Sequence, residues 1–137
     1  MNNSQLLILG KLKSDEFIKF IEGLKVNTVL IFGSTITDVF NEDSDVDIAV
    51  LSSEKLKLND ILNLELFLEE MLNRPIDVVD LNSTNLDLFV KITILNTAKV
   101  VYTNDNNKSL EEMIDRVEIN YRENENFFYY RRLDLLS

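Results

Sequence analysis

Three aspartates are the residues whose types and positions could carry chemistry. Asp45 and Asp47 stand two positions apart in the run Asp-Val-Asp-Ile-Ala-Val-Leu, and Asp77 stands in a later apolar run, Ile-Asp-Val-Val-Asp-Leu. Carboxylates two positions apart on a strand project from the same face, with their Cα atoms roughly 7 Å apart. Such a pair, joined by a third acid from a neighbouring strand, is suited to two divalent cations about 4 Å apart.

A glycine and a serine form the second candidate feature. Gly33 and Ser34 directly follow an apolar, β-branched run that ends at Phe32. Glycine lets the backbone turn sharply and approach a ligand closely. The N–H groups freed at the start of a following helix, together with the Ser34 hydroxyl, would make an anion site. The pair therefore indicates a place for phosphate oxygens.

The composition limits the metals that the aspartates could bind. The 137 residues contain no cysteine and no histidine, which excludes thiolate sites, His-ligated zinc and catalysis by imidazole. Oxygen ligands point to Mg²⁺, Mn²⁺ or Ca²⁺. Acids also stand at positions 1, 3, 5 and 12 of a possible calcium loop, namely Asp43, Asp45, Asp47 and Glu54. Ile48 replaces the glycine that such a loop requires, so we reject a calcium loop.

The net charge of −10 and the pI near 4.4 bear on the kind of partner. Binding to a nucleic-acid backbone needs clustered Lys and Arg, so we expect no direct nucleic-acid contact. A basic partner protein, or a nucleotide that arrives with divalent cations, suits this charge better. No stretch approaches the roughly 20 apolar residues that span a bilayer. We expect a soluble, cytoplasmic protein.

Helices and strands must alternate to position these residues. We expect strands at residues 26–32, 45–51, 76–81 and 98–102. The expected helices cover residues 14–24, with Ser14 as N-cap, then 59–72, with Asn59 as N-cap, then 84–95 and the segment from 109 onward. Leu62, Leu66 and Met71 are among the apolar positions of the second helix. Alternating strands and helices in a chain of this length predict a single layered domain of the α/β or α+β class.

We assign residues 1–107 to the sheet-bearing part and residues 108–137 to a C-terminal helix of the same domain. The end of the chain is dense in aromatic residues and arginine: Tyr121, Phe127, Phe128, Tyr129, Tyr130, Arg131 and Arg132. Such residues are enriched in interface cores, and they also occur in ordinary hydrophobic cores. Both interpretations stay open, so the C-terminal helix is a possible partner-binding element.

Gly33-Ser34, ten residues, Asp45-Val46-Asp47 and a later Asp77 together resemble the DNA polymerase β-like nucleotidyltransferase superfamily. The resemblance covers about residues 26–102. The short length and the ending resemble the minimal MNT-type nucleotidyltransferases, which are antitoxins paired with HEPN-domain toxins. This resemblance implies the nucleotidyltransferase fold, a small mixed β-sheet flanked by helices.

The resemblance also implies roles for the candidate residues. Gly33 and Ser34 would bind the triphosphate of ATP, and Asp45 and Asp47 would bind two Mg²⁺ ions. Asp77 would complete the site of the metal that activates the attacking hydroxyl, and could accept its proton. The implied reaction is transfer of AMP from ATP to a tyrosine hydroxyl of a HEPN toxin, which silences its ribonuclease activity. Positioning and charge neutralisation dominate such transfers, and metals supply both without histidine.

The segment after Ser34 departs from many members of the superfamily. Residues 35–40 contain neither a basic residue nor a glycine, and they add Asp38. Arg74 matches a basic position common in relatives and is a candidate phosphate ligand, although a surface ion pair is its other interpretation. Two alternatives to the implied reaction stay open. One is an inactive or weakly active antitoxin that acts by binding alone, and the other is a small-molecule nucleotidyltransferase of the aminoglycoside type.

Overall fold

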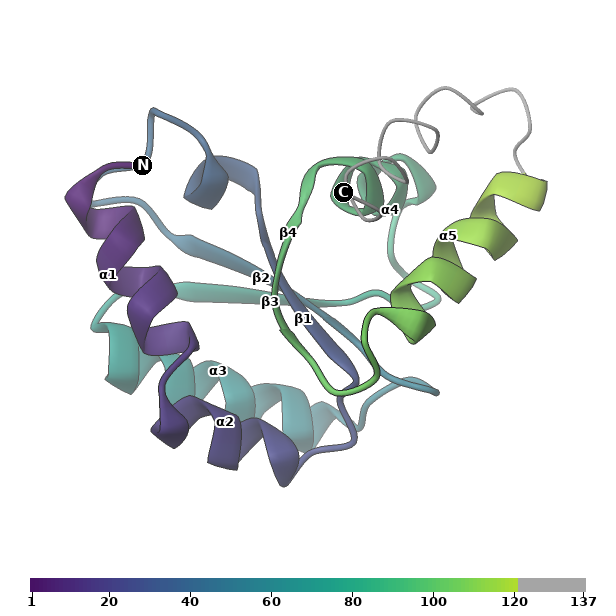
Figure 1. Ribbon diagram of the computed structural model, residues 1–137, viewed down its shortest axis with the longest axis horizontal. Coiled ribbons are helices and arrows are strands. Elements are labelled where there is room, and N and C mark those ends of the chain that lie inside the picture. Colours follow the sequence, from purple (N-terminus) through teal and green to yellow (C-terminus); the bar gives the residue numbers. More distant parts are fainter. Residues whose placement is uncertain (121–137) are drawn as a thin grey trace.

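A computed structural model describes residues 1–120 as five α-helices, one short 3-10 helix and four strands (Figure 1). In chain order these are α1 (Asn3–Leu12), α2 (Asp15–Glu22), β1 (Thr28–Phe32), the 3-10 helix η1 (Gly33–Ile36), β2 (Val46–Leu51), α3 (Leu58–Leu72), β3 (Ile76–Asp80), α4 (Leu88–Thr97), β4 (Lys99–Thr103) and α5 (Lys108–Asn120). The aromatic and arginine-rich stretch 121–136, with its expected role in partner binding, lies outside the described residues. None of the described helices has the length and apolar character needed to cross a membrane.

The four strands form one mixed sheet in the order β3-β2-β1-β4, which confirms the expected fold class. β1 pairs antiparallel with both β2 and β4. β2 and β3 are parallel, because α3 carries the chain back along the sheet between them. The parallel register places Asp47 beside Asp77, and this pairing determines the geometry of the candidate site.

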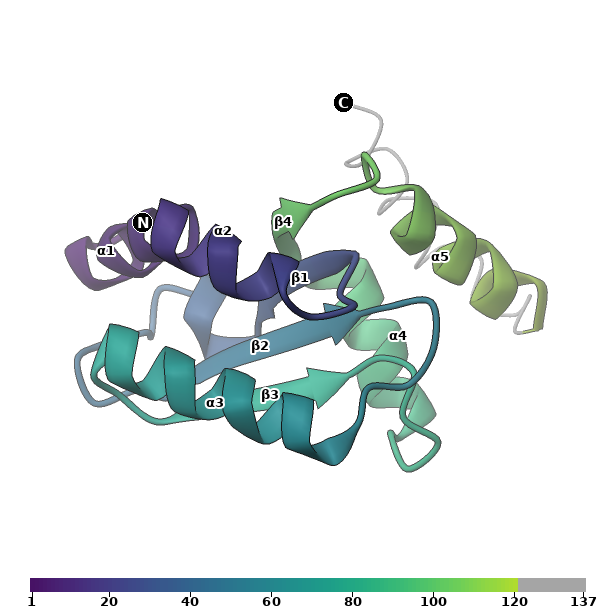
Figure 2. The same cartoon turned by 90° about the horizontal axis from the view of Figure 1, so that it is seen from below.

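Each face of the sheet is covered by a different group of helices (Figures 1 and 2). One core lies between the sheet and α1, α2 and α3, and it includes Val29, Ile31, Val46, Ile48, Val50 and Ile76. The other core lies under α4 and α5, and it includes Leu30, Ala49, Leu51, Ile94 and Leu110. Because side chains alternate along a strand, Asp47 shares a face with Ala49, and Asp77 shares one with Val79. Both carboxylates therefore belong to the face that α4 and α5 cover in part.

Each predicted strand and helix is present with shifted ends, and the starts of α3 and α4 are two of the differences. Ser14 caps α2 as expected, since its hydroxyl accepts the N–H of Phe17. α3 begins at Leu58, before the expected cap Asn59. The carboxylate of Asp80, at the end of β3, accepts the N–H of Leu56 and so fixes the segment that leads into this helix.

The second difference concerns α4, which begins at Leu88, four positions later than expected. Asp87 accepts the N–H groups of Phe89 and Val90 through Oδ1 and is the true N-cap. The prediction starts this helix at residue 84, because residues 84–86 contain no glycine or proline that would prevent a helix. The cap itself is of a type that sequence patterns favour.

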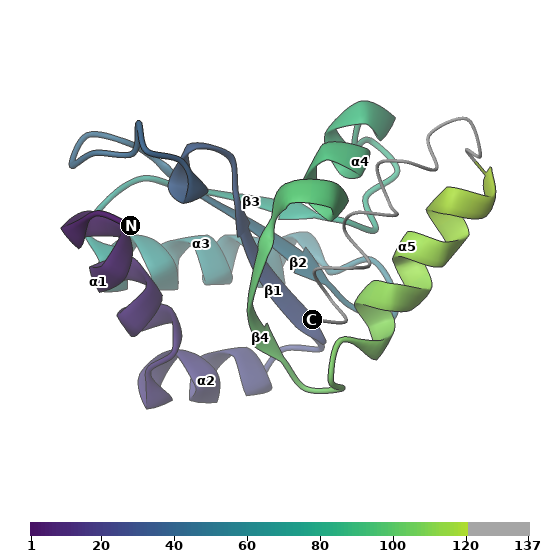
Figure 3. The ribbon, with the colours of Figure 1, turned by 45° about the horizontal axis from the view of Figure 1, so that its top comes forward.

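Helix α1 was absent from the sequence-based prediction, and it supports the segment that follows β1. Asn2 and Gln5 form a capping box, in which each side chain accepts the N–H of the other residue. Gln5 is also buried, and its Nε2 donates to the carbonyl oxygens of Thr35 (3.0 Å) and Thr37 (2.7 Å). Asn2 donates through Nδ2 to the carbonyl oxygen of Phe40 at 2.8 Å. Figure 3 shows the start of α1 and the segment after β1 at the same end of the molecule.

Replacing Gln5 tests this support. We expect Gln5→Ala to lower the free energy of unfolding by about 2 kcal/mol, because buried carbonyl oxygens lose their donors. The exposed neighbour Asn3 provides the control, and Asn3→Ala should change the value by less than about 0.5 kcal/mol. Urea unfolding of both variants measures the difference. Equal effects of the two substitutions would show that α1 does not hold this segment.

Candidate functional site

Two carboxylates lie side by side at one end of the sheet. Asp47 in β2 and Asp77 in β3 are register partners in the parallel pair, so their side chains project from the same face. Asp45 comes directly before β2, which begins at Val46 and not at Asp45 as expected. Asp47 is half-buried, whereas Asp45 and Asp77 are exposed.

Asp47 is under electrostatic strain. Burial raises the pKa of its carboxyl above the ordinary value of 3.8, and the negative charges of Asp77 and Asp45 raise this pKa further. Asp45 and Asp77 are therefore each close enough to act on Asp47. A divalent cation between them would reverse the effect, because a nearby positive charge favours the ionised form.

The turn at Gly33 packs directly against the Asp47 carboxylate. Gly33 has φ = +63°, in the left-handed region that glycine adopts without steric cost. A Cβ atom at this position would lie 2.5 Å from Asp47 Oδ2, which is closer than a Cβ atom approaches another side chain. Because the turn contacts the Asp47 carboxylate, any group that binds along the Gly33-Ser34 backbone would lie next to Asp47.

Thr35 was not among the candidates, yet it links the turn to β2. Its buried side chain accepts the N–H of Asp47 through Oγ1 at 2.9 Å. Its carbonyl oxygen accepts the Nε2 donor of Gln5. Thr35 and Gln5 therefore fix the position of Asp47 relative to the turn. The Asn-x-x-Gln capping box at the start of the chain was the available sign of this helix, whereas nothing in the sequence pattern marks Thr35.

Arg74 lies beside the segment that precedes Asp45. Its Nη1 donates to the carbonyl oxygens of Asn41 and Ser44, both at 3.0 Å. Its guanidinium also lies over the ring of Phe40, 4.8 Å from the ring centroid. These contacts position the backbone that leads into Asp45. A contact between Arg74 and a phosphate stays a prediction.

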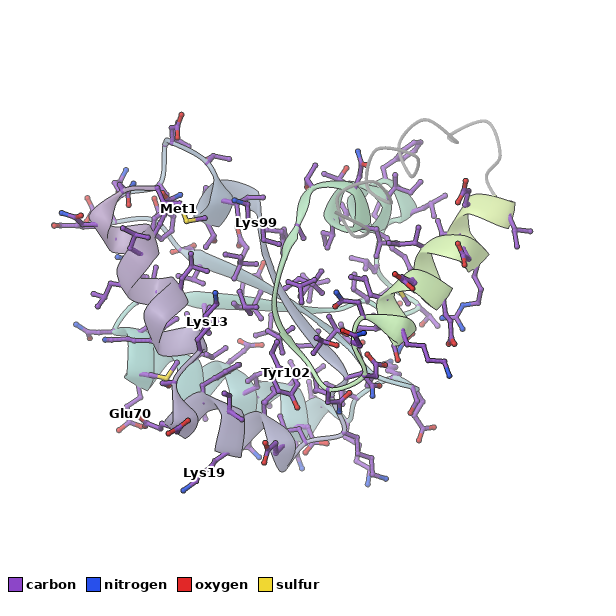
Figure 4. The ribbon with its side chains drawn as sticks, viewed as in Figure 1. Met1, Lys13, Lys19, Glu70, Lys99 and Tyr102 are labelled. Carbon is purple, nitrogen blue, oxygen red and sulfur yellow. The ribbon has the colours of Figure 1, made fainter. Side chains whose placement is uncertain are left out.

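The basic residue that begins β4 belongs to the opposite face of the sheet. Lys99, labelled in Figure 4, is the register partner of Ile31. Ile31 packs in the core under α1, α2 and α3, so Lys99 projects away from the face that bears Asp47. The segment 35–40 contributes no cation either. Metal ions would therefore have to balance much of any phosphate charge at the turn.

The donor set fits a hard divalent cation that keeps several water ligands. Within residues 1–120, no three acidic side chains are already arranged as the ligands of a metal ion. Asp47 and Asp77 supply adjacent oxygens, and the exposed side chain of Asp45 can turn toward them. Mg²⁺ is commonly bound by one or two carboxylates, water and substrate phosphates, so a partly formed oxygen site suits it.

Gly33 and Gly10 provide a matched pair of substitutions. We expect Gly33→Ala to lower the free energy of unfolding by about 2 kcal/mol or more, through the left-handed backbone and the collision with Asp47. Gly10→Ala adds a Cβ that meets nothing within 4 Å in helix α1, and it should stabilise the chain by about 0.5–1 kcal/mol. Urea unfolding measures both values. A neutral or stabilising Gly33→Ala would contradict the close approach of the turn to Asp47.

Comparison with known proteins bears on the fold and on the family. No curated protein matches the chain by sequence. A chain from the crystal structure of a toxin–antitoxin complex with AMP-PNP superposes with a TM-score of 0.57 at 20% identity, over 80% of this chain and 92% of that one. A chain from the toxin–antitoxin complex MntA–HepT gives a TM-score of 0.53 at 19% identity, over 82% and 93%.

A third similar structure contains a tri-AMPylated Shewanella oneidensis HEPN toxin in complex with an MNT antitoxin. Its TM-score is 0.54 at 19% identity, over 87% of this chain and 93% of that one. At these identities the likeness shows the fold. The family described as "Polymerase beta, Nucleotidyltransferase" matches residues 15–107, well over half of the chain and all of its strands and candidate site residues. The chain therefore belongs to the polymerase β-type nucleotidyltransferase family.

Proposed function

We propose that this chain is a Mg²⁺-dependent adenylyltransferase antitoxin that transfers AMP from ATP to a tyrosine hydroxyl of a HEPN-domain toxin. The observation that carries the proposal is the in-register pair Asp47 and Asp77 beside the Gly33 turn. Membership of the nucleotidyltransferase family supports the reaction class. The similar structures support the nucleotide and the partner, since one contains AMP-PNP and another an AMPylated HEPN toxin with its MNT antitoxin.

The backbone at Gly33 and Ser34 would bind the triphosphate next to the aspartates. Asp45 and Asp47 would hold two Mg²⁺ ions, and Asp77 would share the one near the acceptor. When bound, these ions neutralise phosphate charge and lower the pKa of the acceptor hydroxyl. In the transfer, the tyrosine oxygen forms a bond to the α-phosphorus, the bond to the bridging oxygen of the β-phosphate breaks, and pyrophosphate leaves. Asp77 accepts the phenolic proton.

Residues behind the carboxylates position them. Thr35 holds the backbone of Asp47, and Gln5 holds Thr35. Arg74 holds the backbone that leads into Asp45. Because small displacements of reacting groups lower the rates of such transfers strongly, we assign all three residues to positioning.

A second function is favoured by one observation. Residues 35–40 offer no basic side chain to the triphosphate, and Lys99 projects from the other face of the sheet. A chain of this kind could neutralise its toxin by binding alone, without transfer. The two functions predict different outcomes for the same experiment.

Incubation of the chain with ATP labelled at its α-phosphate, Mg²⁺ and its partner HEPN-domain toxin tests the proposal. We expect label on a tyrosine of the HEPN protein, located by mass spectrometry. Asp47→Asn should lower the transfer rate by about 100-fold or more, because metal binding contributes several kcal/mol to such reactions. The exposed acid Glu16 in α2 provides the control, and Glu16→Gln should transfer at the unaltered rate.

Neutralisation of the toxin without label, and equally by the Asp47→Asn variant, would support binding alone and refute the transfer. Removal of Mg²⁺ with EDTA should stop the labelling, and added Mn²⁺ should restore it, since both ions accept oxygen ligands.

A further inference from the structure

Helix α3 carries a row of exposed leucines on its outer side. The side of α3 that faces the sheet is formed by three buried leucines, Leu64, Leu68 and Leu72. A second row, Leu58, Leu62 and Leu66, is 69%, 46% and 62% exposed. The sequence pattern placed Leu62 and Leu66 among the apolar positions of this helix, but the structure puts both on its outer side.

The spacing makes these leucines one continuous ridge. Residues i, i+4 and i+8 follow each other along one side of a helix, so Leu58, Leu62 and Leu66 adjoin. Figure 2 shows α3 running along β3 with its outer side turned away from the sheet. Single exposed leucines are ordinary, whereas an aligned row on a helix face is typical of a surface that binds another protein.

Acidic side chains border this ridge on the side of β3 and stand at its C-terminal end. All charged residues of α3 are acidic: Asp60, Glu65, Glu69 and Glu70. Helical spacing puts Glu65 and Glu69 in a row between the leucines and β3, and puts Glu70 one turn after Leu66, at the C-terminal end of the ridge. Figure 4 shows Glu70 at the outer surface of the molecule.

The acidic border continues into the candidate site. Burial raises the pKa of Glu65, and the charges of Asp77 and Glu69 raise this pKa further. Asp77 is thus close enough to act on a residue of the row beside the leucines. A protein that covers the ridge would lie next to the carboxylates at the edge strand β3.

Charge decides which protein fits. Two copies of this chain would bring acidic borders together, and each copy has a net charge of −10. Like charges that face each other across an interface cost several kcal/mol. A helix with an apolar stripe flanked by lysine or arginine would instead pair with the leucines and the glutamates together.

We propose that the ridge Leu58, Leu62 and Leu66 is the docking surface of α3 for the toxin, which would present an apolar helix face bordered by basic residues. The inference rests on the proposed function for the identity of the partner. Docking there places the toxin along β3, so that its acceptor hydroxyl can reach the carboxylates of Asp47 and Asp77.

The absence of cysteine from the chain allows a direct test. A thiol introduced by Leu62→Cys is the only one in the chain, and mass spectrometry follows its reaction with a maleimide. In the presence of the partner HEPN-domain toxin, we expect this thiol to react at least about tenfold more slowly, by analogy with the exclusion of water from interface centres. Leu7→Cys, at a position in α1 that is 61% exposed, is the control and should react at nearly the same rate with and without the partner.

Each other outcome overturns the docking surface. If the thiol of the Leu62→Cys chain stays unprotected while the partner is bound, the interface lies elsewhere. Protection in the chain alone, independent of concentration, would mean that its own residues cover the ridge, and protection that grows with concentration would indicate a second copy.

The Asp47→Asn chain separates this inference from the proposed function. With Asp47→Asn and Leu62→Cys combined, AMP transfer should be lost while the introduced thiol stays protected. Transfer by the Leu62→Cys chain without protection of its thiol would overturn the docking surface and leave the reaction standing. Protection of the thiol in the Leu62→Cys chain without AMP transfer would support the docking surface and overturn the proposed reaction.

Discussion

The parallel pairing of β2 with β3 places the carboxylates of Asp47 and Asp77 next to each other, and the Gly33 turn holds that pair against the end of β1. Burial raises the pKa of Asp47, and the charges of Asp77 and Asp45 raise this pKa further, so the ionised pair is unfavourable for the fold. The turn at Gly33 has a left-handed backbone and leaves no room for a Cβ atom beside the same carboxylate. This combination has little value for stability, but it brings an oxygen donor set and a phosphate-accessible backbone together, as nucleotidyl transfer requires.

The surrounding structure keeps this arrangement in place. On one side, Gln5 of α1 binds Thr35, whose hydroxyl holds the N–H of Asp47. On the other side, Arg74 holds the carbonyl oxygens of Asn41 and Ser44 ahead of Asp45. Both side chains are far in sequence from the segment that they hold, which lies 30 or more positions away from each of them. The segment between β1 and β2 is therefore fixed by α1 and by the start of β3, while the sheet fixes the carboxylates themselves.

Local patterns were enough to predict the parts of the molecule that depend on nearby residues. The alternation in residues 45–51 and the apolar run before Gly33 predicted β2 and β1. The metal site shared by Asp45, Asp47 and Asp77 stays a prediction. The roles of Gln5 and Thr35 could not be predicted, because these two residues are 30 positions apart and their contact leaves no mark in the local pattern of apolar and polar residues. Leu62 and Leu66 were assigned to the apolar side of α3 because a helix with two leucine rows has no single apolar side in its sequence. The segment that leads into α3 is held by Asp80 of β3, a residue 24 positions away, so the predicted start of α3 was also wrong.

The central claim is that Asp45, Asp47 and Asp77 gather a pair of divalent cations next to the Gly33-Ser34 turn. Anomalous X-ray scattering from crystals grown with Mn²⁺ and AMP-PNP locates such ions directly. Two manganese peaks between these carboxylates and the nucleotide's phosphates, with the phosphates along the Gly33-Ser34 backbone, would agree with the account. Manganese bound elsewhere, or a nucleotide bound on the α1–α3 face of the sheet, would contradict it.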